Sequence, residues 1–309
     1  MEVYHGIKVM DKSKNIVIAL GNFDGVHLGH RELIRRTREI AETEKGIPAV
    51  FTFDPHPMKV LQPDRYPPML LSREEKINIL SGLGIRLLII TPFSKDISML
   101  SPEAFVNEIL VDRLNVRAVI VGYNYNFGYR GEGNVETLRH LTENRGIRTV
   151  VVSPVKLHGV EVSSTLIRRL LLEGKVFEAA EYLGYHPFVT SRVVEGDRRG
   201  RELGFPTANM DLPADILVPA NGVYAVRVYL NGSILKAIAN IGIKPTFQAD
   251  RPINLEVHCL GFSGNLYGEL IKVEFIKRIR GEQAFSSAGE LTRRIRKDME
   301  EAEKIFPGL

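Results

Sequence analysis

Two histidines after a glycine-rich turn are the residues of this chain best spaced for chemistry on a phosphate group. His27 and His30 lie three residues apart, so one helical turn can present both imidazoles on the same side. The segment at 21–30 reads Gly-Asn-Phe-Asp-Gly-Val-His-Leu-Gly-His, and its glycines allow a tight turn and a close approach to a ligand. Two imidazoles there can donate hydrogen bonds to phosphoryl oxygens. A metal-binding pair or two ordinary surface histidines would show the same spacing.

A run of hydroxyl side chains followed by arginine forms a second candidate anion site. Ser163, Ser164 and Thr165 begin a segment with helical spacing, and Arg168 follows within one turn. A helix start offers free amide groups, and guanidinium groups bind phosphate oxygens, so the segment fits a second contact to a triphosphate. Helix capping alone is the simpler explanation.

Two further polar clusters come directly after expected strands. Asp54 and His56 alternate with prolines that stiffen the loop. Asn124 and Phe127 belong to a stretch at 122–128 that mixes aromatic rings with amides, which suits a flat heteroaromatic ligand. A rigid turn without chemistry would explain the first cluster equally well, and aromatic rings that fill core gaps would explain the second.

A loop rich in glycine and arginine, at 196–209, stands in the C-terminal part of the chain and has the composition of a phosphate loop. Thr207 and Asn209 alternate along an extended segment, so both can face one Mg²⁺ ion or phosphate group. Glu256, on a later strand, can take a proton from a substrate hydroxyl. A glycine-rich β-turn would also account for the loop, and a salt bridge to Lys272 would also account for Glu256.

The elements expected in the first half place the first clusters at strand ends. Apolar, β-branched runs that predict strands alternate with segments of helical spacing. We predict strands at 16–20, 47–53, 85–91, 116–121 and 147–152. One helix is predicted to follow the motif at 21–30 and to end at Gly46, and further helices are predicted at 73–83, 102–114 and 135–144. Such alternation favours a buried parallel sheet in a Rossmann-like α/β domain, where ligands bind at the carboxyl ends of strands.

The pattern changes after Pro187, where strand-like segments follow without long helices between them. These segments lie at 188–194, 223–230, 233–241, 253–260 and 270–276, with the hairpin signal Asn231-Gly232 between two of them. They favour a small antiparallel β-barrel, closed or nearly closed. A charged amphipathic helix is predicted at 287–305, with Arg293, Arg294, Arg296 and Lys297 on its solvated face. We therefore predict two domains, 1–184 and 185–309.

Composition describes an ordinary soluble globular protein. The chain has 309 residues, 41 basic and 37 acidic side chains, and a net charge of +4, which suits anionic substrates but is too weak to argue nucleic-acid binding. Cys259 is the only cysteine, so no internal disulfide forms and a reducing cytoplasm fits. We see no signal peptide and no apolar run of ~18 residues, so we expect no membrane segment.

Taken together, the chain resembles the bacterial bifunctional riboflavin kinase/FMN adenylyltransferases, also called prokaryotic FAD synthetases. Beside the motif at 21–30, the resemblance rests on Phe-Asp-Pro-His-Pro at 53–57, Ser-Ser-Thr at 163–165 and Gly-Arg-Glu-Leu-Gly-Phe-Pro-Thr-Ala-Asn at 200–209. Asn-Ile-Gly-Ile-Lys-Pro-Thr-Phe at 240–247 and Leu-Tyr-Gly at 266–268 add to it. It implies a nucleotidylyltransferase domain that makes FAD and pyrophosphate from FMN and ATP. It also implies a riboflavin kinase barrel that makes FMN with a second ATP.

The resemblance also implies site residues, which we state as expectations. In the N-terminal domain, ATP is expected at Gly21, Phe23, Asp24, His27, Gly29, His30, Ser163, Ser164, Thr165 and Arg168, and the flavin at Asp54, Asn124 and Phe127. In the barrel, ATP is expected at Gly196, Gly200, Arg201, Gly204, Pro206, Thr207 and Asn209. Thr207 and Asn209 would hold Mg²⁺, and Glu256 would be the base acting on the ribityl hydroxyl. The expected partners are riboflavin, FMN, FAD and ATP, with no nucleic acid and no membrane.

Two departures from the family pattern leave room for a different function. Leu166 stands where relatives usually carry arginine, and Asn124 where aspartate is frequent. If either change disabled adenylyl transfer, the protein would be a riboflavin kinase with a relic domain. We also consider a nucleic-acid-binding module and a flavin-storage protein. The near balance of charge argues against the first of these, and the two phosphate loops argue against the second.

Overall fold

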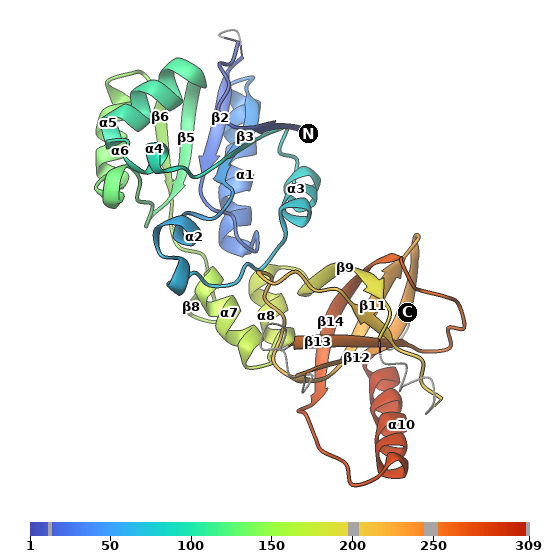
Figure 1. Ribbon diagram of the computed structural model, residues 1–309. Coiled ribbons are helices and arrows are strands. Elements are labelled where there is room, and N and C mark those ends of the chain that lie inside the picture. The colour runs from blue at the N-terminus through green and yellow to red at the C-terminus, as the bar shows by residue number, and fades with distance from the viewer. Residues whose placement is uncertain (12–13, 197–203, 244–252, 307–309) are drawn as a thin grey trace. The chain divides into compact units, whose positions relative to one another are not determined.

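The computed structural model describes residues 1–11, 14–196, 204–243 and 253–306, drawn as ribbons in Figure 1. The chain divides into two compact units, Met1–Ser164 and Thr165–Leu309, and each is described here by itself. Within the described ranges, no helix combines the length and the apolar character needed to cross a membrane.

The first unit is built on a parallel sheet of six strands in the order β1-β4-β3-β2-β5-β6. Their bounds are β1 Glu2–His5, β2 Ile16–Leu20, β3 Ile47–Phe53, β4 Leu87–Thr91, β5 Val116–Gly122 and β6 Arg148–Val152. The five predicted strands are present, and the predicted α/β class is confirmed. The sixth, β1, was not anticipated, because it is a four-residue edge strand paired only with β4.

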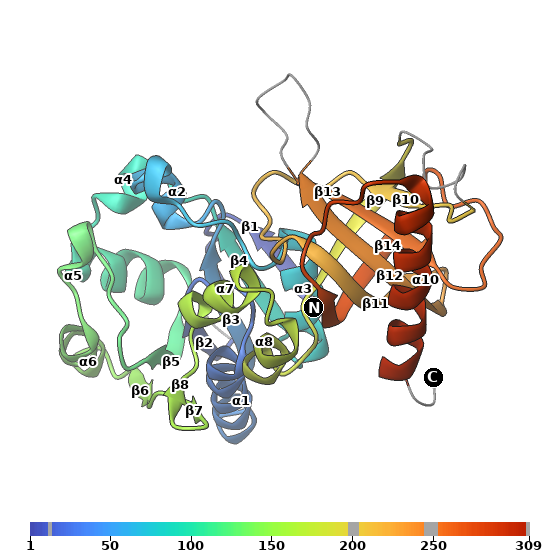
Figure 2. The same ribbon diagram turned by 90° about the horizontal axis from the view of Figure 1, so that it is seen from below.

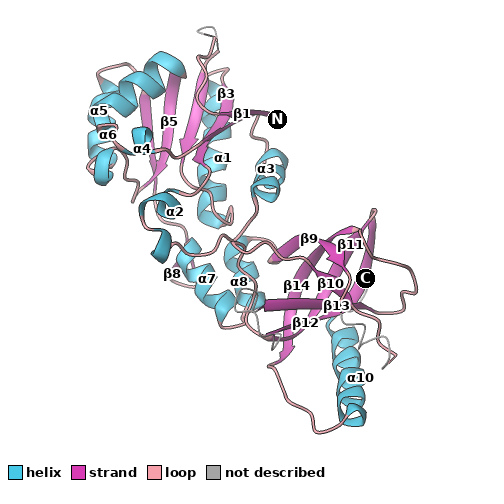
Figure 3. Ribbon diagram, viewed as in Figure 1, coloured by secondary structure: helices cyan, strands magenta, loops and turns pink. Residues whose placement is uncertain are grey.

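Helices cover both faces of this sheet (Figures 1 and 3). On one face α1 (Leu28–Thr43) packs against β2, β3 and β5. On the other, the π-helical η2 (Phe105–Arg113) and α6 (Val135–Glu143) contribute to one apolar core with alternate residues of the strands, and the short α5 (Pro102–Ala104) leads into η2. The predicted helix at 102–114 is therefore mostly π-helical. Two turns are too few for an apolar pattern to separate the α and π periods.

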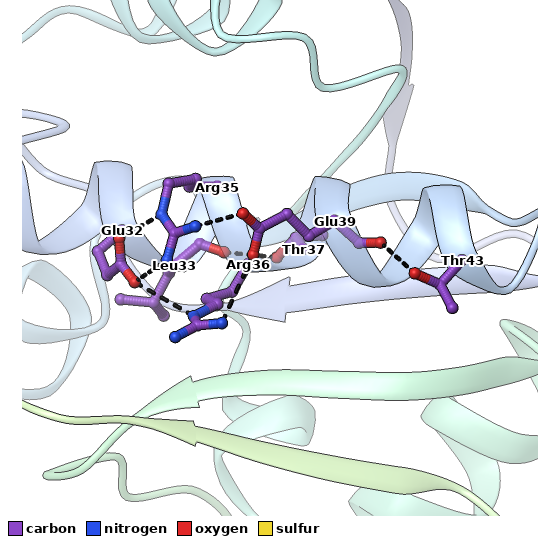
Figure 4. A network of polar contacts seen from close by, with 7 residues as sticks. All are labelled: Glu32, Leu33, Arg35, Arg36, Thr37, Glu39 and Thr43. Atoms are coloured by element: carbon purple, nitrogen blue, oxygen red, sulfur yellow. Dashed lines mark hydrogen bonds and ion pairs between the residues drawn. The ribbon is translucent and has the colours of Figure 1, made fainter.

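The polar face of α1 carries a network of exposed ion pairs, shown in Figure 4. Arg35 donates to both oxygens of Glu32 at 2.7 and 2.6 Å and also pairs with Glu39. Exposed pairs of this kind contribute little to stability. The stability of α1 therefore comes mainly from its buried residues, Leu33, Ile34, Thr37, Ile40 and Ala41.

Short elements connect the main ones. They are α2 (Pro57–Leu61), η1 (Pro63–Arg65), α3 (Arg73–Gly82), α4 (Lys95–Ser98), η3 (Tyr129–Gly131) and the hairpin of β7 (Lys156–Leu157) with β8 (Val160–Glu161). Among them α3 matters most for the site. It begins with a reciprocal capping box between Ser72 and Glu75, which fixes where its first turn points.

The second unit contains a closed antiparallel barrel in the order β10-β13-β12-β11-β14-β9. The strands are β9 Phe188–Val194, β10 Ala208–Met210, β11 Gly222–Leu230, β12 Ser233–Ile243, β13 Ile253–Cys259 and β14 Leu270–Arg280. The predicted barrel is confirmed, as is the hairpin between β11 and β12. Asn231 and Gly232 have φ of 47° and 82°, the left-handed pair that a two-residue turn requires.

Two helices, α8 (Val176–Leu183) and α10 (Ala288–Ile305), pack on the barrel. α7 (Ser164–Leu172) leads into α8, which contacts β14. α10 lies along β11, β12 and β14, as Figure 2 shows. Its Asp298 is 1% exposed and accepts hydrogen bonds from Arg280. Arg294 also pairs with Asp298 at 3.0 Å, so the prediction that Arg294 belongs to a purely solvated face was wrong.

Candidate functional site

The turn between β2 and α1 has a strained backbone. Phe23, Gly25 and Val26 adopt φ of 49°, 81° and 34°. Positive φ is unusual for a β-branched residue such as Val26, and it persists only where surrounding contacts enforce it. Both Phe23 and Val26 are fully buried, which places the turn in the body of the unit rather than on a free loop.

The two histidines stack at the start of α1. Their ring centroids are 3.7 Å apart with an angle of 16° between the ring planes. His27 is the N-cap of α1, and its Nδ1 accepts the backbone N–H of His30 at 3.3 Å. Because Nδ1 accepts, the neutral ring of His27 carries its proton on Nε2. Gly29 permits this arrangement, since a Cβ there would lie 3.2 Å from the His27 ring.

Electrostatics keep His30 neutral. Burial lowers the pKa of His30 well below its usual value, and the nearby His27 and Lys76 lower it further. Its Nδ1 is withdrawn from water and has no hydrogen-bond partner among the residues that the structure describes. A neutral imidazole with an unused nitrogen is suited to donate or accept one hydrogen bond with an incoming ligand.

Three neighbouring segments hold the turn in place. Asp24 is 2% exposed and accepts the backbone N–H of Leu70 at 2.9 Å, so its carboxylate binds the protein itself. The hydroxyl of Ser164 donates to the Asp24 carbonyl at 2.9 Å, which brings the predicted second anion segment to the first one. The carbonyl of Asn22 accepts two donors, Thr52 Oγ1 at 3.1 Å and Lys76 Nζ at 3.0 Å.

The loop after β3 also contacts this turn. His56 Nδ1 accepts the N–H of Met58 at 3.1 Å and caps α2, while its Nε2 lies 3.1 Å from Asn22 Nδ2. Asp54 accepts a hydrogen bond from Arg73 at 3.3 Å and is exposed on one side. The structure therefore places the expected flavin residue Asp54 on the loop that joins the histidine turn.

The aromatic segment after β5 has two different environments. Phe127 is buried and packs against Phe105, with ring centroids 5.6 Å apart, in the main core. Burial raises the pKa of the neighbouring Tyr125. Asn124 is exposed at the carboxyl end of β5. Core filling accounts for the position of Phe127, and the flavin roles of Asn124 and Phe127 stay predictions.

The remaining residues of the predicted ATP site lie just after β2 and at the start of α7. Gly21 directly follows β2 and donates its N–H to the Phe51 carbonyl at 3.2 Å, and the Phe23 ring lies 5.1 Å from the His30 ring. Ser163 immediately precedes α7, whereas Thr165 and Arg168 lie within its first two turns. The roles of Thr165 and Arg168 toward ATP stay predictions.

In the barrel, strand register brings two predicted residues together. Asn209 on β10 stands directly opposite Glu256 on β13. Asn209 is 6% exposed, and its Oδ1 has no hydrogen-bond partner within the described ranges. Gly196 makes room for it, because a Cβ at that position would lie 2.1 Å from the Asn209 side chain.

The other barrel residues cluster around this pair. Glu256 accepts a hydrogen bond from Asn254 at 2.8 Å, while Lys272 pairs with Glu274 at 3.6 Å on β14, so the predicted competing salt bridge does not form. Gly204, Pro206 and Thr207 lead into β10, and the Pro206 carbonyl accepts from His258 Nδ1 at 2.8 Å. Gly200 and Arg201 lie outside the described residues.

The sequence did not point to Thr52, Leu70 and Lys76, which donate hydrogen bonds to the turn. Their contacts span 30 to 54 positions along the chain, so no local motif contains them. One signal was available for Lys76, which precedes the fully buried Leu80 by four residues and so shares a helix face with it.

The comparisons with known proteins cover both units. The sequence profile of the FAD synthetase family matches residues 9–166, and that of the riboflavin kinase family matches residues 183–306. The chain is 39% identical to the bifunctional riboflavin kinase/FMN adenylyltransferase of Bacillus subtilis, over 99% of this chain and 96% of that protein. It is 35% identical to the protein of the same name from Escherichia coli, over 99% of this chain and 98% of that protein.

A solved structure has the same fold over both units. It is described as a macrolide-efflux protein from Streptococcus pneumoniae, and it superposes with a TM-score of 0.89 at 29% identity, over 97% of this chain and 98% of that one. Profile matches in both halves and full-length relatives above 30% identity agree on one assignment. The chain belongs to the bifunctional riboflavin kinase/FMN adenylyltransferase family, and it makes FMN from riboflavin and FAD from FMN.

Proposed function

We propose that adenylyl transfer takes place at the histidine turn. An oxygen of the FMN phosphate attacks the α-phosphorus of ATP, the bond from that phosphorus to the bridging oxygen breaks, and pyrophosphate leaves. His27 and His30 donate hydrogen bonds to the phosphoryl oxygens, where negative charge builds up. The observation that carries this proposal is the stacked pair of imidazoles at a helix N-terminus, one of them with an unused buried nitrogen.

The backbone around the histidines supports an anion site. The first amides of α1 point out of the helix at His27, and the positive end of the helix dipole favours negative charge there. Gly21 and Gly29 leave room for the rings of Phe23 and His27, since a Cβ at either position would lie 3.2 Å from the respective ring. We assign Ser163, Ser164, Thr165 and Arg168 to the same ATP, as the family resemblance implies.

We assign the kinase reaction to the pair formed by Asn209 and Glu256. Glu256 takes the proton of the terminal ribityl hydroxyl as that oxygen attacks the γ-phosphorus of ATP and ADP leaves. Asn209 and Thr207 would hold Mg²⁺, and the unpartnered buried Oδ1 of Asn209 fits a metal ligand. The ion, when bound, neutralises charge on the phosphates.

One reciprocal experiment tests both assignments. Full-length His27→Ala and Glu256→Gln variants are incubated with ATP and Mg²⁺, once with riboflavin and once with FMN, and FMN and FAD are resolved by chromatography. The proposal requires the histidine variant to accumulate FMN from riboflavin. It requires the glutamate variant to make FAD only when FMN is supplied. Equal loss of both activities in either variant would contradict the assignment of separate sites.

Two coarser expectations complete the proposal. We place the enzyme in the cytoplasm, because with Cys259 as their one cysteine these 309 residues form no internal disulfide, which fits a reducing compartment. Its partners are small flavins and ATP rather than a nucleic acid, since the net charge is only +4.

A further inference from the structure

Lys76 is a buried cation beside the histidine turn to which the resemblance gave no role. Its side chain is 6% exposed and lies on the first turn of α3. Among the residues that the structure describes, it makes no ion pair, and its ammonium donates to the carbonyl of Asn22 at 3.0 Å. Burying an ammonium group is costly unless hydrogen bonds and nearby charges compensate it, so its hydrogen bond to the Asn22 carbonyl carries weight.

Lys76 donates to a backbone carbonyl in the turn that positions the two histidines. Two non-glycine residues with positive φ follow Asn22 in the turn. They are Phe23, with φ of 49°, and Val26, with φ of 34°. Thr52 donates to the same carbonyl, but it is neutral and sits at the end of β3. Charge-assisted hydrogen bonds are roughly twice as strong as neutral ones, so the ammonium is the stronger of the two constraints on this carbonyl.

The charges around Lys76 favour the same role. Burial lowers the pKa of the Lys76 ammonium, whereas the carboxylates of Asp24 and Asp54 raise it. Asp24 also accepts the Leu70 amide and Asp54 pairs with Arg73, so both carboxylates bind other donors as well as acting on Lys76 through space. Lys76 therefore lies among the groups that surround the histidine turn, with its Nζ on the Asn22 carbonyl.

We propose that Lys76 is a positioning residue for adenylyl transfer: its ammonium fixes the Asn22 carbonyl and thereby holds the turn that presents His27 and His30. This inference rests on the proposed role of the two histidines. A misplacement of about 1 Å by a change remote from the reacting atoms can cost ~10²-fold in rate. Lys76 should therefore govern kcat for FAD formation more than the KM for FMN.

The test compares four full-length variants in FMN adenylylation with ATP and Mg²⁺. Lys76→Met removes the donor and the charge at nearly constant length, and we expect kcat to fall ~10²-fold with KM for FMN changed by less than about threefold. Lys76→Arg keeps the charge in a different geometry and should lose ~10-fold. Thr52→Val, which removes only the neutral donor, should lose less than about threefold. Lys45→Met, just past the opposite end of α1, is the matched control and should behave as wild type.

The outcomes separate a positioning role from a merely structural one. Riboflavin phosphorylation by each preparation normalises the enzyme concentration through the barrel unit, and the melting curve shows whether the first unit is folded. Lys76→Met with kcat within about threefold of wild type, a loss confined to KM, or an equal loss in Thr52→Val would overturn the inference. If Lys76→Met does not fold, Lys76→Arg decides, because wild-type kcat in that variant contradicts the proposal.

A parallel assay of His27→Ala separates this inference from the proposed function. If His27→Ala retains FAD formation, the role of the turn itself is wrong. If it loses FAD formation while both Lys76 variants retain it, only the role of Lys76 is wrong.

Discussion

At the scale of single residues, the first site depends on two stacked imidazoles, of which burial keeps His30 neutral. The N-cap hydrogen bond sets the tautomer of His27, and burial sets the charge of His30. Two protonated imidazoles with ring centroids 3.7 Å apart would repel each other, so the stack disfavours a charge on both rings at once. In the barrel, Glu256 and Asn209 also act as a pair, because the register of β10 and β13 puts them opposite each other.

The first prediction concerns the histidines. His27→Ala or His30→Ala should lower FAD formation from supplied FMN by ~10²–10³, the usual loss when one preorganised donor to a developing phosphoryl charge is removed. Riboflavin phosphorylation by the same preparations should be unchanged. Steady-state rates of both reactions check this, and a similar fall in both would contradict the assignment of separate sites.

The second prediction concerns acid. The pKa of His30 is lowered in the folded protein, so below its unfolded value of about 6.5 the unfolded chain binds a proton that the folded chain does not. The contribution of neutral His30 to the free energy of unfolding is therefore fully present above that pH. It is lost as the pH falls from there toward the pKa of His30 in the folded protein. His30→Gln should remove this part of the acid sensitivity. Urea unfolding of wild type and variant at pH 5.5 and 7.5 measures it; parallel curves would refute the assignment.

The third prediction concerns Glu256. Glu256→Gln keeps the shape of the side chain and removes the base, so FMN formation should fall by about 10²–10⁴. Since Glu256 accepts one neutral hydrogen bond and Lys272 pairs elsewhere, the melting temperature should change little. Kinase turnover at the wild-type rate would exclude Glu256 as the base.

At the scale of elements, α10 is attached to the barrel by one buried ion cluster and a small apolar cluster. Arg280 on β14 places two nitrogens on Asp298, and Arg294 adds a third contact at 3.0 Å. Ala302 and Phe306 join a core cluster with barrel residues. Such an ion cluster fixes the position of the helix, but its net stabilisation is smaller than its Coulomb energy suggests, because burying the charges is costly.

The fourth prediction follows from the difference between the small net stabilisation by an intact buried ion cluster and the large cost of removing one of its members. Asp298→Asn removes the carboxylate and leaves two guanidinium groups beside a neutral amide, which should lower the free energy of unfolding of this unit by about 3–5 kcal/mol. Arg296→Gln on the same helix, which enters none of these contacts, is the control and should change it by less than about 0.5 kcal/mol. Chemical denaturation followed by riboflavin kinase activity reports the unit, and similar midpoints for the two variants would contradict the prediction.

At the scale of the whole molecule, α7 and α8 belong by their contacts to the barrel unit. The Ala220 N–H donates to the Leu171 carbonyl at 2.9 Å, and Arg278 donates to the Glu173 carbonyl at 3.4 Å. Gly174 is favoured here because its φ of 75° lies in the left-handed region. The domain boundary at 184/185 stays a prediction, and the compact unit begins twenty residues earlier, at Thr165.

The fifth prediction compares two truncations. Fragments 165–309 and 185–309 should both make FMN and neither should make FAD, because the histidine turn is absent from both. The longer fragment should melt at the higher temperature, since it keeps the buried residues Val176, Ala179 and Leu183 of α8. Thermal melting and the FMN assay check both points. FAD formation by either fragment, or an equal melting temperature, would count against this account.

Local patterns in the sequence were enough for the motifs and most elements. The His-x-x-His spacing, the Asn-Gly hairpin and the alternation of apolar strands with helices are short-range features, and the fold that they predicted is confirmed. The sequence did not reveal β1 and β10, because three or four residues at a sheet edge or loop end carry too little periodicity.

Only the tertiary structure decided which distant groups complete the sites. Lys76 reaches Asn22 across 54 positions, and Asp298 reaches Arg280 from a separate helix. Asn209 faces Glu256 through strand register alone. A hydrogen bond between distant residues depends on packing and register, which no spacing within one segment encodes. The sequence by itself therefore determined which chemistry the chain carries, and the fold decided which buried charges hold that chemistry in place.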